Sequence, residues 1–267
     1  MKLAHSSCPN DTFIFHAWTH GLIEGAPMVE VRYADIDVTN SAAERGEFDV
    51  VKVSYAALPW LLDRYRLLPT GGALGRGCGP LVLSRGDLDS VDDRSVAVPS
   101  ERSTAYLLFR LWASGQRPRR IDVIPFAEIM PAVRDGAYDA GLVIHEARFT
   151  FAQYGLTSLV DLGAWWEEDT GLPIPLGAIL ARRDLDTELI TRVVRASVER
   201  AWADPGASAD YVAAHAAEMA PDVQQQHIAL YVNDFTRELG DQGYAAAAAL
   251  LDRAFTAGLT PSSPLLR

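Results

Sequence analysis

His145 is the side chain in this sequence best placed to move a proton. It follows an apolar run at residues 140–144 and precedes a segment with helical spacing, residues 146–154. An imidazole titrates near neutral pH, so at the end of a buried strand it can act as a general base. A histidine that caps a helix or is held by buried hydrogen bonds would occupy the same position. Position alone therefore leaves both roles open.

Small hydroxyl and amide residues follow several other strand-like runs. Asn10 and Asp11 come after the first run, Ser54 after the third, and Ser103 and Thr104 after a run in the middle of the chain. Such residues cap the helix that follows. The free backbone amides of a helix N-terminus can also hold a carboxylate or phosphate group. Capping is the commoner role for one residue, but the repetition of the pattern favours a binding site for a small anion.

Short β-rich runs alternate with helical patterns and must position these residues. The predicted strands are residues 2–5, 28–36, 50–53, 80–84, 95–98, 121–124, 140–144 and 176–181. This alternation predicts an α/β fold with mixed, mostly parallel sheets and helices on both faces. Ligands of such sheets bind beyond the carboxyl ends of the strands, where the residues above lie. From residue 187 onward the pattern is helical, with an Ala-rich block at residues 244–255.

The order of these patterns predicts two lobes. We expect a discontinuous outer lobe of residues 1–85 and 178–267, which includes the helical C-terminal part. An inner lobe of residues 86–177 is inserted into it, because two strand-like segments near residues 79–85 and 175–183 bracket that block without a linker. These two segments are the expected hinge, and the ligand is expected in a cleft between the lobes.

Composition excludes several classes of partner. The chain has 267 residues and a net charge of -11, which repels nucleic acid, although a few local donors can still hold a small anion. Its two cysteines, Cys8 and Cys78, build no disulfide framework. No signal peptide and no membrane span stand out, so we expect a cytoplasmic protein without a membrane partner. A homodimer is the default assembly on frequency.

Three further features carry weaker hypotheses. His16 and His20 have the i, i+4 spacing of metal ligands, but no Cys/His/carboxylate cluster accompanies them, so we predict no metal site. Residues 71–79 are rich in glycine but lack the spacing of a nucleotide-binding loop. Lys52 is one of only two lysines in the chain, and its presence reflects either chance or a function.

Several stretches taken together resemble the 1,4-dihydroxy-6-naphthoate synthases of the futalosine route to menaquinone. They are SSCPNDTFIFHAWTHG, DVVKVSYAAL, GGALGRGCGPLVL, PSERSTAYLL and AYDAGLVIHEARFTF. The resemblance runs from Ser6 to about Arg183. The resemblance implies a fold like that of type II periplasmic binding proteins. It also implies conversion of cyclic dehypoxanthinyl futalosine into 1,4-dihydroxy-6-naphthoate with release of dihydroxyacetone. No metal or organic cofactor is implied.

The resemblance also implies roles for individual residues. His145 corresponds to the catalytic base. Ser54 and the turn Ser103-Thr104-Ala105 correspond to ligand-binding positions at helix starts. Asn10 and Asp11 lie in the N-terminal motif, where they contact the ligand or brace the loop.

Two other functions fit the same scaffold. Chorismate dehydratase acts earlier in the same pathway and also binds a small carboxylate, and a shared fold does not separate the two enzymes. A non-catalytic carboxylate-binding protein of the cytoplasm would use the same strand ends without turnover. The motif that ends in His145 favours the synthase.

Overall fold

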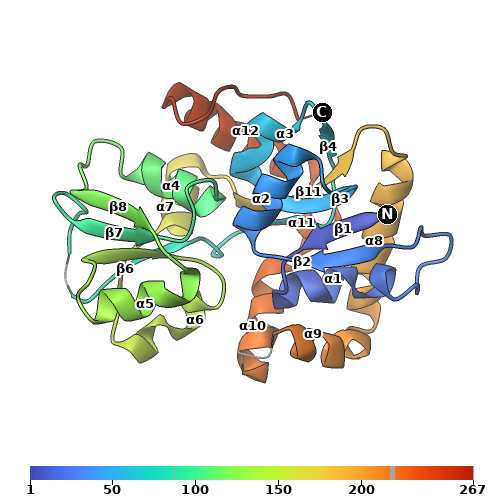
Figure 1. Cartoon of the computed structure of the whole chain (residues 1–267), viewed down its shortest axis with the longest axis horizontal. Helices are drawn as coiled ribbons and strands as arrows, with labels where there is room; N and C mark the ends of the chain where they lie inside the picture. Colours follow the sequence, from blue (N-terminus) through green and yellow to red (C-terminus); the bar gives the residue numbers. More distant parts are fainter. Residues whose placement is uncertain (87, 217–219, 267) are drawn as a thin grey trace. The chain divides into compact units, whose positions relative to one another are not determined.

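The computed structural model describes residues 1–86, 88–216 and 220–266. The chain forms two compact units. The first unit comprises Met1–Gly75 with Pro175–Arg267, and the second unit comprises Arg76–Ile174. Each unit is an α/β sandwich around its own sheet (Figure 1). No helix in the described ranges is long and apolar enough to cross a membrane.

The sheet of the first unit has strand order β2-β1-β3-β11-β4, and β5 pairs with β11. Its strands are β1 (Lys2–His5), β2 (Glu30–Tyr33), β3 (Val50–Ser54), β4 (Tyr65–Leu67), β5 (Ala73–Gly75) and β11 (Ile174–Arg182). β1 runs parallel to both β2 and β3, whereas β11 runs antiparallel to β3 and β4. The carboxyl ends of β1 and β3 therefore share one edge of the sheet.

Helices cover both faces of this sheet. They are α1 (Pro9–Thr19), α2 (Ile36–Arg45), η1 (Tyr55–Ala57), α3 (Leu58–Leu61), α8 (Thr187–Ala203), η3 (Pro205–Ser208), α9 (Ala209–His215), α10 (Pro221–Tyr231), α11 (Asp234–Arg237) and α12 (Gly240–Thr256). In the view of Figure 1, α1, α9 and α10 lie below the sheet and α2 and α3 above it. The main core joins Leu3, Val50 and Ile179 of the strands to Phe15 of α1 and Val194 of α8. Full burial of each such side chain stabilises the fold by about 1.5–3 kcal/mol.

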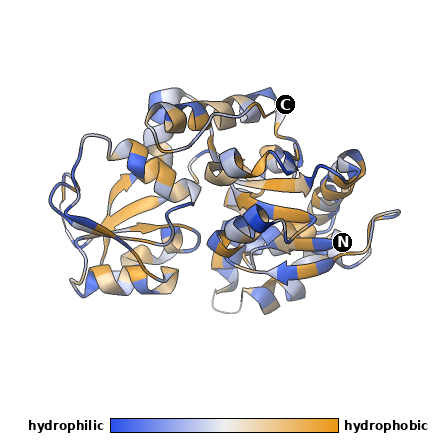
Figure 2. Cartoon of the chain, turned by 45° about the horizontal axis from the view of Figure 1, so that its top comes forward, coloured by the Kyte–Doolittle hydropathy of each residue, from blue (hydrophilic) through white to orange (hydrophobic). Residues whose placement is uncertain are grey.

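The sheet of the second unit has strand order β10-β6-β9-β7-β8. Its elements are β6 (Leu81–Ser84), β7 (Ser95–Val98), α4 (Thr104–Trp112), β8 (Arg120–Val123), α5 (Phe126–Arg134), β9 (Ala140–Val143), α6 (Ala147–Thr150), η2 (Phe151–Tyr154), β10 (Thr157–Asp161) and α7 (Leu162–Thr170). β7 is parallel to β8 and β9, and β6 is antiparallel to β9 and β10. The strands of both sheets are mostly hydrophobic, whereas the helices mix both residue classes (Figure 2).

The structure corrects the expected boundary between the lobes. β6 pairs with β9 and β10, and residues 76–85 belong to the second unit and not to the outer lobe. Likewise, residues 175–177 lie in β11 and belong to the first unit. Sequence patterns place each strand but not its partners, and it is the partners that decide which unit a strand joins.

Three strands of the structure were not predicted, and two predicted elements were too long. β4 and β5 have three residues each, and β10 begins with polar residues, so none has a clear apolar pattern. The run at residues 28–36 shortens to β2, because Ile36 already begins α2. The segment at residues 146–154 is not one helix: it divides into α6 and the 3-10 turn η2.

Gly141 in β9 tests how tightly the second unit is packed. A Cβ at this position would lie 2.6 Å from a methyl group of Ile129 and 2.8 Å from one of Val133, both on α5. We expect Gly141→Ala to lower the free energy of unfolding by about 1–3 kcal/mol, because α5 must move away from the sheet. Gly86→Ala is the matched control, since its Cβ meets nothing within 4 Å. Equal stability of the two variants in urea unfolding would contradict this packing.

Candidate active site

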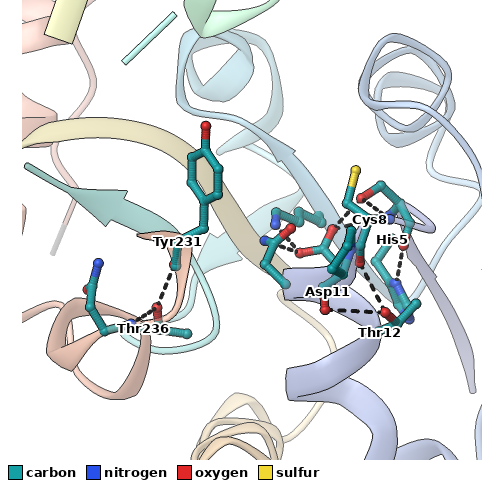
Figure 3. Close-up of polar contacts among 11 residues, drawn as sticks. His5, Cys8, Asp11, Thr12, Tyr231 and Thr236 are labelled. Carbon is teal, nitrogen blue, oxygen red and sulfur yellow. Dashed lines mark hydrogen bonds and ion pairs between the residues drawn. The ribbon is translucent and has the colours of Figure 1, made fainter. Parts of the chain in front are cut away.

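Asp11 is the centre of the polar contacts at the carboxyl end of β1. It lies in the first turn of α1 and is fully buried. One carboxylate oxygen accepts hydrogen bonds from the hydroxyl of Ser6 (2.7 Å) and its backbone N–H (3.3 Å). The other accepts from the side-chain amide of Asn10 at 2.9 Å and from the ammonium of Lys52 (Figure 3). Asp11 therefore braces the loop between β1 and α1 from both sides.

The ion pair between Lys52 and Asp11 joins β3 to the start of α1. Lys52 is 6% exposed, so both charges are removed from water. Burial alone would raise the pKa of Asp11, but the Lys52 ammonium, together with His5 and the hydrogen bonds from Lys52 and Ser6, lowers it below its ordinary value. Gly177 of β11 provides the space, because a Cβ there would lie 2.9 Å from Cε of Lys52.

His5 ends β1 and is completely buried beside this ion pair. Its Nδ1 lies 2.7 Å from the carbonyl oxygen of Ser6, so Nδ1 carries the proton and donates it. The ring stacks on Phe15 and meets the edge of Tyr33. Nε2 has no hydrogen-bond partner among the described residues. Burial, opposed in part by Asp11, lowers the pKa of His5, so this imidazole is neutral at pH 7.

Ser54 ends β3 and is held by Asn40 of α2. The backbone N–H of Ser54 donates to Oδ1 of Asn40 at 2.8 Å, and the Asn40 amide donates to the Ser54 hydroxyl at 3.2 Å. Ser54 is buried, and its side chain does not cap the following 3-10 turn. Its hydroxyl hydrogen can still be donated. The capping alternative is therefore wrong for Ser54.

The turn after β7 begins α4 in the second unit. The hydroxyl of Ser103 accepts a hydrogen bond from the backbone N–H of Tyr106 at 3.1 Å, which makes Ser103 a true N-cap. Thr104 and Ala105 follow in the first helical turn, and both are buried. The Ala105 amide has no acceptor in the helix itself, as expected for a first turn.

His145 follows β9 and lies at the same edge of the second unit's sheet as the turn after β7. Because β7, β8 and β9 are parallel, the residues that follow them gather at one edge. The His145 ring accordingly meets Phe126, which follows β8, with ring centroids 5.8 Å apart. The backbone of His145 has φ of 53°, the left-handed region that non-glycine residues rarely adopt. Such a conformation costs free energy and is concentrated at functional sites.

Comparison with known proteins identifies the family. The family described as Menaquinone biosynthesis matches residues 1–256. The chain belongs to this family. It is 61% identical to the 1,4-dihydroxy-6-naphthoate synthase of Streptomyces coelicolor, over 98% of this chain and 95% of that protein. It is 47% identical to the synthase of the same name from Thermus thermophilus, over 99% of this chain and 97% of that protein.

Solved structures confirm the predicted fold of this menaquinone biosynthesis family member. A crystal structure of a protein from Archaeoglobus fulgidus is 33% identical and superposes with a TM-score of 0.89, covering 97% of both chains. The alkanesulfonate-binding protein of Xanthomonas axonopodis shares 15% identity and has a TM-score of 0.73, covering 100% of this chain and 96% of that one. The latter match shows only the fold, which is that of periplasmic binding proteins.

The predicted site residues of this family member fall into two groups. Asn10, Asp11 and Ser54 lie at one sheet edge of the first unit. The second group, in the second unit, lies at the shared edge after β7 and β9 and consists of Ser103, Thr104, Ala105 and His145. Within each unit the structure therefore brings together the residues that the sequence placed at strand ends.

Lys52, His5 and Asn40 take part in these contacts, although none of them is among the predicted site residues. The rarity of lysine was a signal for Lys52, although its partner Asp11 is 41 residues away. The position of His5 at the end of a predicted strand was a signal as well. Asn40 is one of the polar residues that follow the second predicted strand, and in the structure it lies in the interior of α2.

Removal of one charge from the buried pair tests its contribution. We expect Lys52→Met to lower the free energy of unfolding by about 3–5 kcal/mol, because it leaves the buried Asp11 carboxylate without a counter-charge. The double variant Lys52→Met with Asp11→Asn regains part of this loss. Lys2→Met, which changes the other lysine of the chain, is the control and stays near wild type. A wild-type stability for Lys52→Met in urea unfolding would contradict the ion pair.

The lowered pKa of His5 predicts a dependence of stability on pH. In the unfolded chain a histidine gains its proton near pH 6.5, whereas buried His5 stays neutral to a lower pH. The unfolded state therefore binds more protons below pH 6.5, and stability falls as the pH falls from 6.5 toward the folded pKa. His5→Asn makes this slope shallower between pH 8 and 5. Parallel slopes for wild type and His5→Asn would refute the assignment.

Proposed function

We propose that this chain is a 1,4-dihydroxy-6-naphthoate synthase that acts in menaquinone biosynthesis. It converts cyclic dehypoxanthinyl futalosine into 1,4-dihydroxy-6-naphthoate and releases dihydroxyacetone. The observation that carries the proposal is the 61% identity to a synthase of this name over nearly the whole length of both chains. The second synthase, at 47% identity, supports the same activity.

His145 is the proposed general base. Cleavage of a carbon–carbon bond next to a carbonyl group begins when a base removes a proton from a hydroxyl group or from carbon. The electron pair of the broken bond then passes to the carbonyl side, where it forms an enolate-like charge. A neutral imidazole accepts such a proton near neutral pH and returns it to the product. The left-handed backbone of His145 supports this role, since it aims the ring from the end of β9 at a conformational cost.

Stabilisation of negative charge is the other requirement, and each unit holds donors that can provide it. In the second unit, we assign the substrate carboxylate to the first turn of α4, at the Ala105 amide and the Thr104 hydroxyl. Ser103 supports that turn as its cap. In the first unit, Ser54 has a hydroxyl hydrogen to donate, and Lys52 has ammonium hydrogens beyond the one that it gives to Asp11. Asn10 and Asp11 hold the neighbouring loop between β1 and α1.

The proposal includes the partners and the compartment. A chain with a net charge of -11 is suited to a small carboxylate held by local donors and not to nucleic acid or an anionic membrane. We place the enzyme in the cytoplasm and expect a homodimer. Cell fractionation and sedimentation velocity of the purified protein test these two points.

The first test of the activity is a mass-spectrometric assay with cyclic dehypoxanthinyl futalosine. Wild type forms 1,4-dihydroxy-6-naphthoate, and His145→Asn reduces the rate by about 10²–10⁴-fold. Asparagine suits the test because it tolerates the left-handed backbone at this position. Exposed His20→Asn is the control and keeps full activity. Product from both wild type and His145→Asn would remove His145 from the mechanism. Absence of product from wild type would refute the synthase, and chorismate is then the next substrate to assay.

The two neighbouring hydroxyl residues at the start of α4, Ser103 and Thr104, give a second test. We expect Thr104→Val to raise KM about tenfold, because it removes a donor to the substrate carboxylate. Ser103→Ala removes the cap, so it lowers stability by about 1 kcal/mol with a smaller change in KM. An unchanged KM in Thr104→Val would remove Thr104 from the site. Steady-state kinetics and urea unfolding of both variants separate these effects.

A further inference from the structure

The first unit contains a cavity of about 680 Å³ that is rich in arginine. It lies between β4, the start of α8 and the last described residues of the chain. Four arginines line it, Arg66, Arg183, Arg192 and Arg195, against the single carboxylate of Glu188. Acidic residues outnumber basic ones in the whole chain by 35 to 24, so this cavity reverses the balance of the protein. A local excess of guanidinium groups on an acidic protein attracts anions to one place.

This cavity lies far from the strand ends of the candidate active site in the topology of the sheet. β11 runs antiparallel to β3, with Gly177 opposite Ser54 and Ala181 opposite Val50. Arg183 follows β11, so it emerges at the sheet edge opposite the one where Ser54 ends β3. The cavity is therefore a separate site from the Asp11 and Ser54 contacts.

Two of the arginines are already fixed in position. Nε of Arg183 donates to the carbonyl oxygen of Leu62 at 2.8 Å, which orients its guanidinium group and leaves the two terminal nitrogens for another acceptor. Arg195 pairs with the carboxylate of Glu238, so its charge is compensated. Arg183 therefore adds an oriented positive charge to the cavity, whereas Arg195 adds no net charge.

Arg66 and Arg192 supply uncompensated charge. Both are exposed, and neither has a salt bridge within the described ranges of the chain. Arg66 stands on β4, the last strand in the sheet order, and Arg192 lies one turn after Glu188 on α8. A guanidinium group holds the oxygens of a phosphate or carboxylate with two parallel hydrogen bonds. The pair is thus suited to a group with more than one anionic oxygen.

The remainder of the lining is largely apolar. Leu67 and Leu68 are 5% and 3% exposed and form part of the wall. Leu265, at the other side, is 93% exposed, and Leu266 and Tyr244 stand near it. An exposed leucine beside a cavity offers apolar surface that a ligand can cover, at about 25 cal/mol per Å² buried. Arginines and leucines in one cavity match a ligand with an anionic head and an apolar body.

We propose that this cavity is a second ligand site of the protein, for a small amphipathic organic anion with a phosphate or carboxylate head on an aliphatic body. Arg66 and Arg192 bind the head together with Arg183, and the leucines cover the body. A free amphiphile and the headgroup of a membrane lipid share this chemistry. The concave shape of the site favours the free molecule, because a bilayer presents its headgroups on a flat surface.

Octyl phosphate below its micellar concentration is the probe, titrated into the full-length protein by isothermal calorimetry. We expect one site per chain. Inorganic phosphate, which has only the head, and 1-octanol, which has only the body, each bind at least tenfold more weakly. The double variant Arg66→Gln with Arg192→Gln raises the Kd for octyl phosphate at least tenfold. Arg200→Gln, an exposed position on the same helix outside the cavity, changes it less than twofold.

Three results would overturn the proposal. The first is the absence of octyl phosphate binding to wild type. The second is a Kd that the double variant shares with wild type, since the ligand would then occupy another place. The third comes from sedimentation with vesicles that contain phosphatidic acid: if the vesicles bind through Arg66 and Arg192 and octyl phosphate does not, the surface recognises a membrane. Circular dichroism of the double variant confirms that its fold is intact.

Discussion

The carboxylate of Asp11 and the ammonium of Lys52 form a buried ion pair inside the first unit. The placement of the strand-end residues of this unit depends on that ion pair. Two charges removed from water are tolerated only as a pair. A shift of α1 or of β3 would separate Asp11 from Lys52 and leave each buried charge without its partner. Asp11 also holds Ser6 and Asn10. The pair thereby converts a short loop into a fixed support. Gly177 of β11 belongs to the same constraint, because any side chain there would displace Lys52.

The second unit positions its groups by other means. There the parallel strands β7, β8 and β9 deliver their following residues to one edge, and hydrogen bonds of the turn and helix start hold α4. His145 is placed by its own backbone, which leaves β9 in a left-handed turn against Phe126. One unit thus relies on buried charge and the other on backbone geometry. Both arrangements fix side chains before any ligand arrives, which reduces the entropy that binding must overcome.

The sequence predicts those parts of this structure that depend on local patterns. Apolar runs located β1, β3, β7 and β9 closely, and the residues after them were therefore recognised as candidates. Ser103 shows the limit of that approach, because a cap and a ligand contact require the same residue type at the same position. The partner of Lys52 lies 41 residues away, and only the packing of α1 on the sheet brings them together. Likewise, no sequence pattern predicts the left-handed backbone of His145. The three-residue strand β4 is recognisable as a strand only through its pairing with β11.

The sheet order has a consequence for how the chain is made. In the first unit, β11 lies between β3 and β4, yet it is synthesised after the whole of the second unit. When β4 leaves the ribosome, the place beside β3 must stay vacant until about one hundred further residues have emerged, given that domains fold as units during translation. The second unit is contiguous and can fold during that interval. Native-like assembly therefore depends on β3 and β4 not pairing early, and the brevity and the exposed arginine of β4 discourage that premature contact.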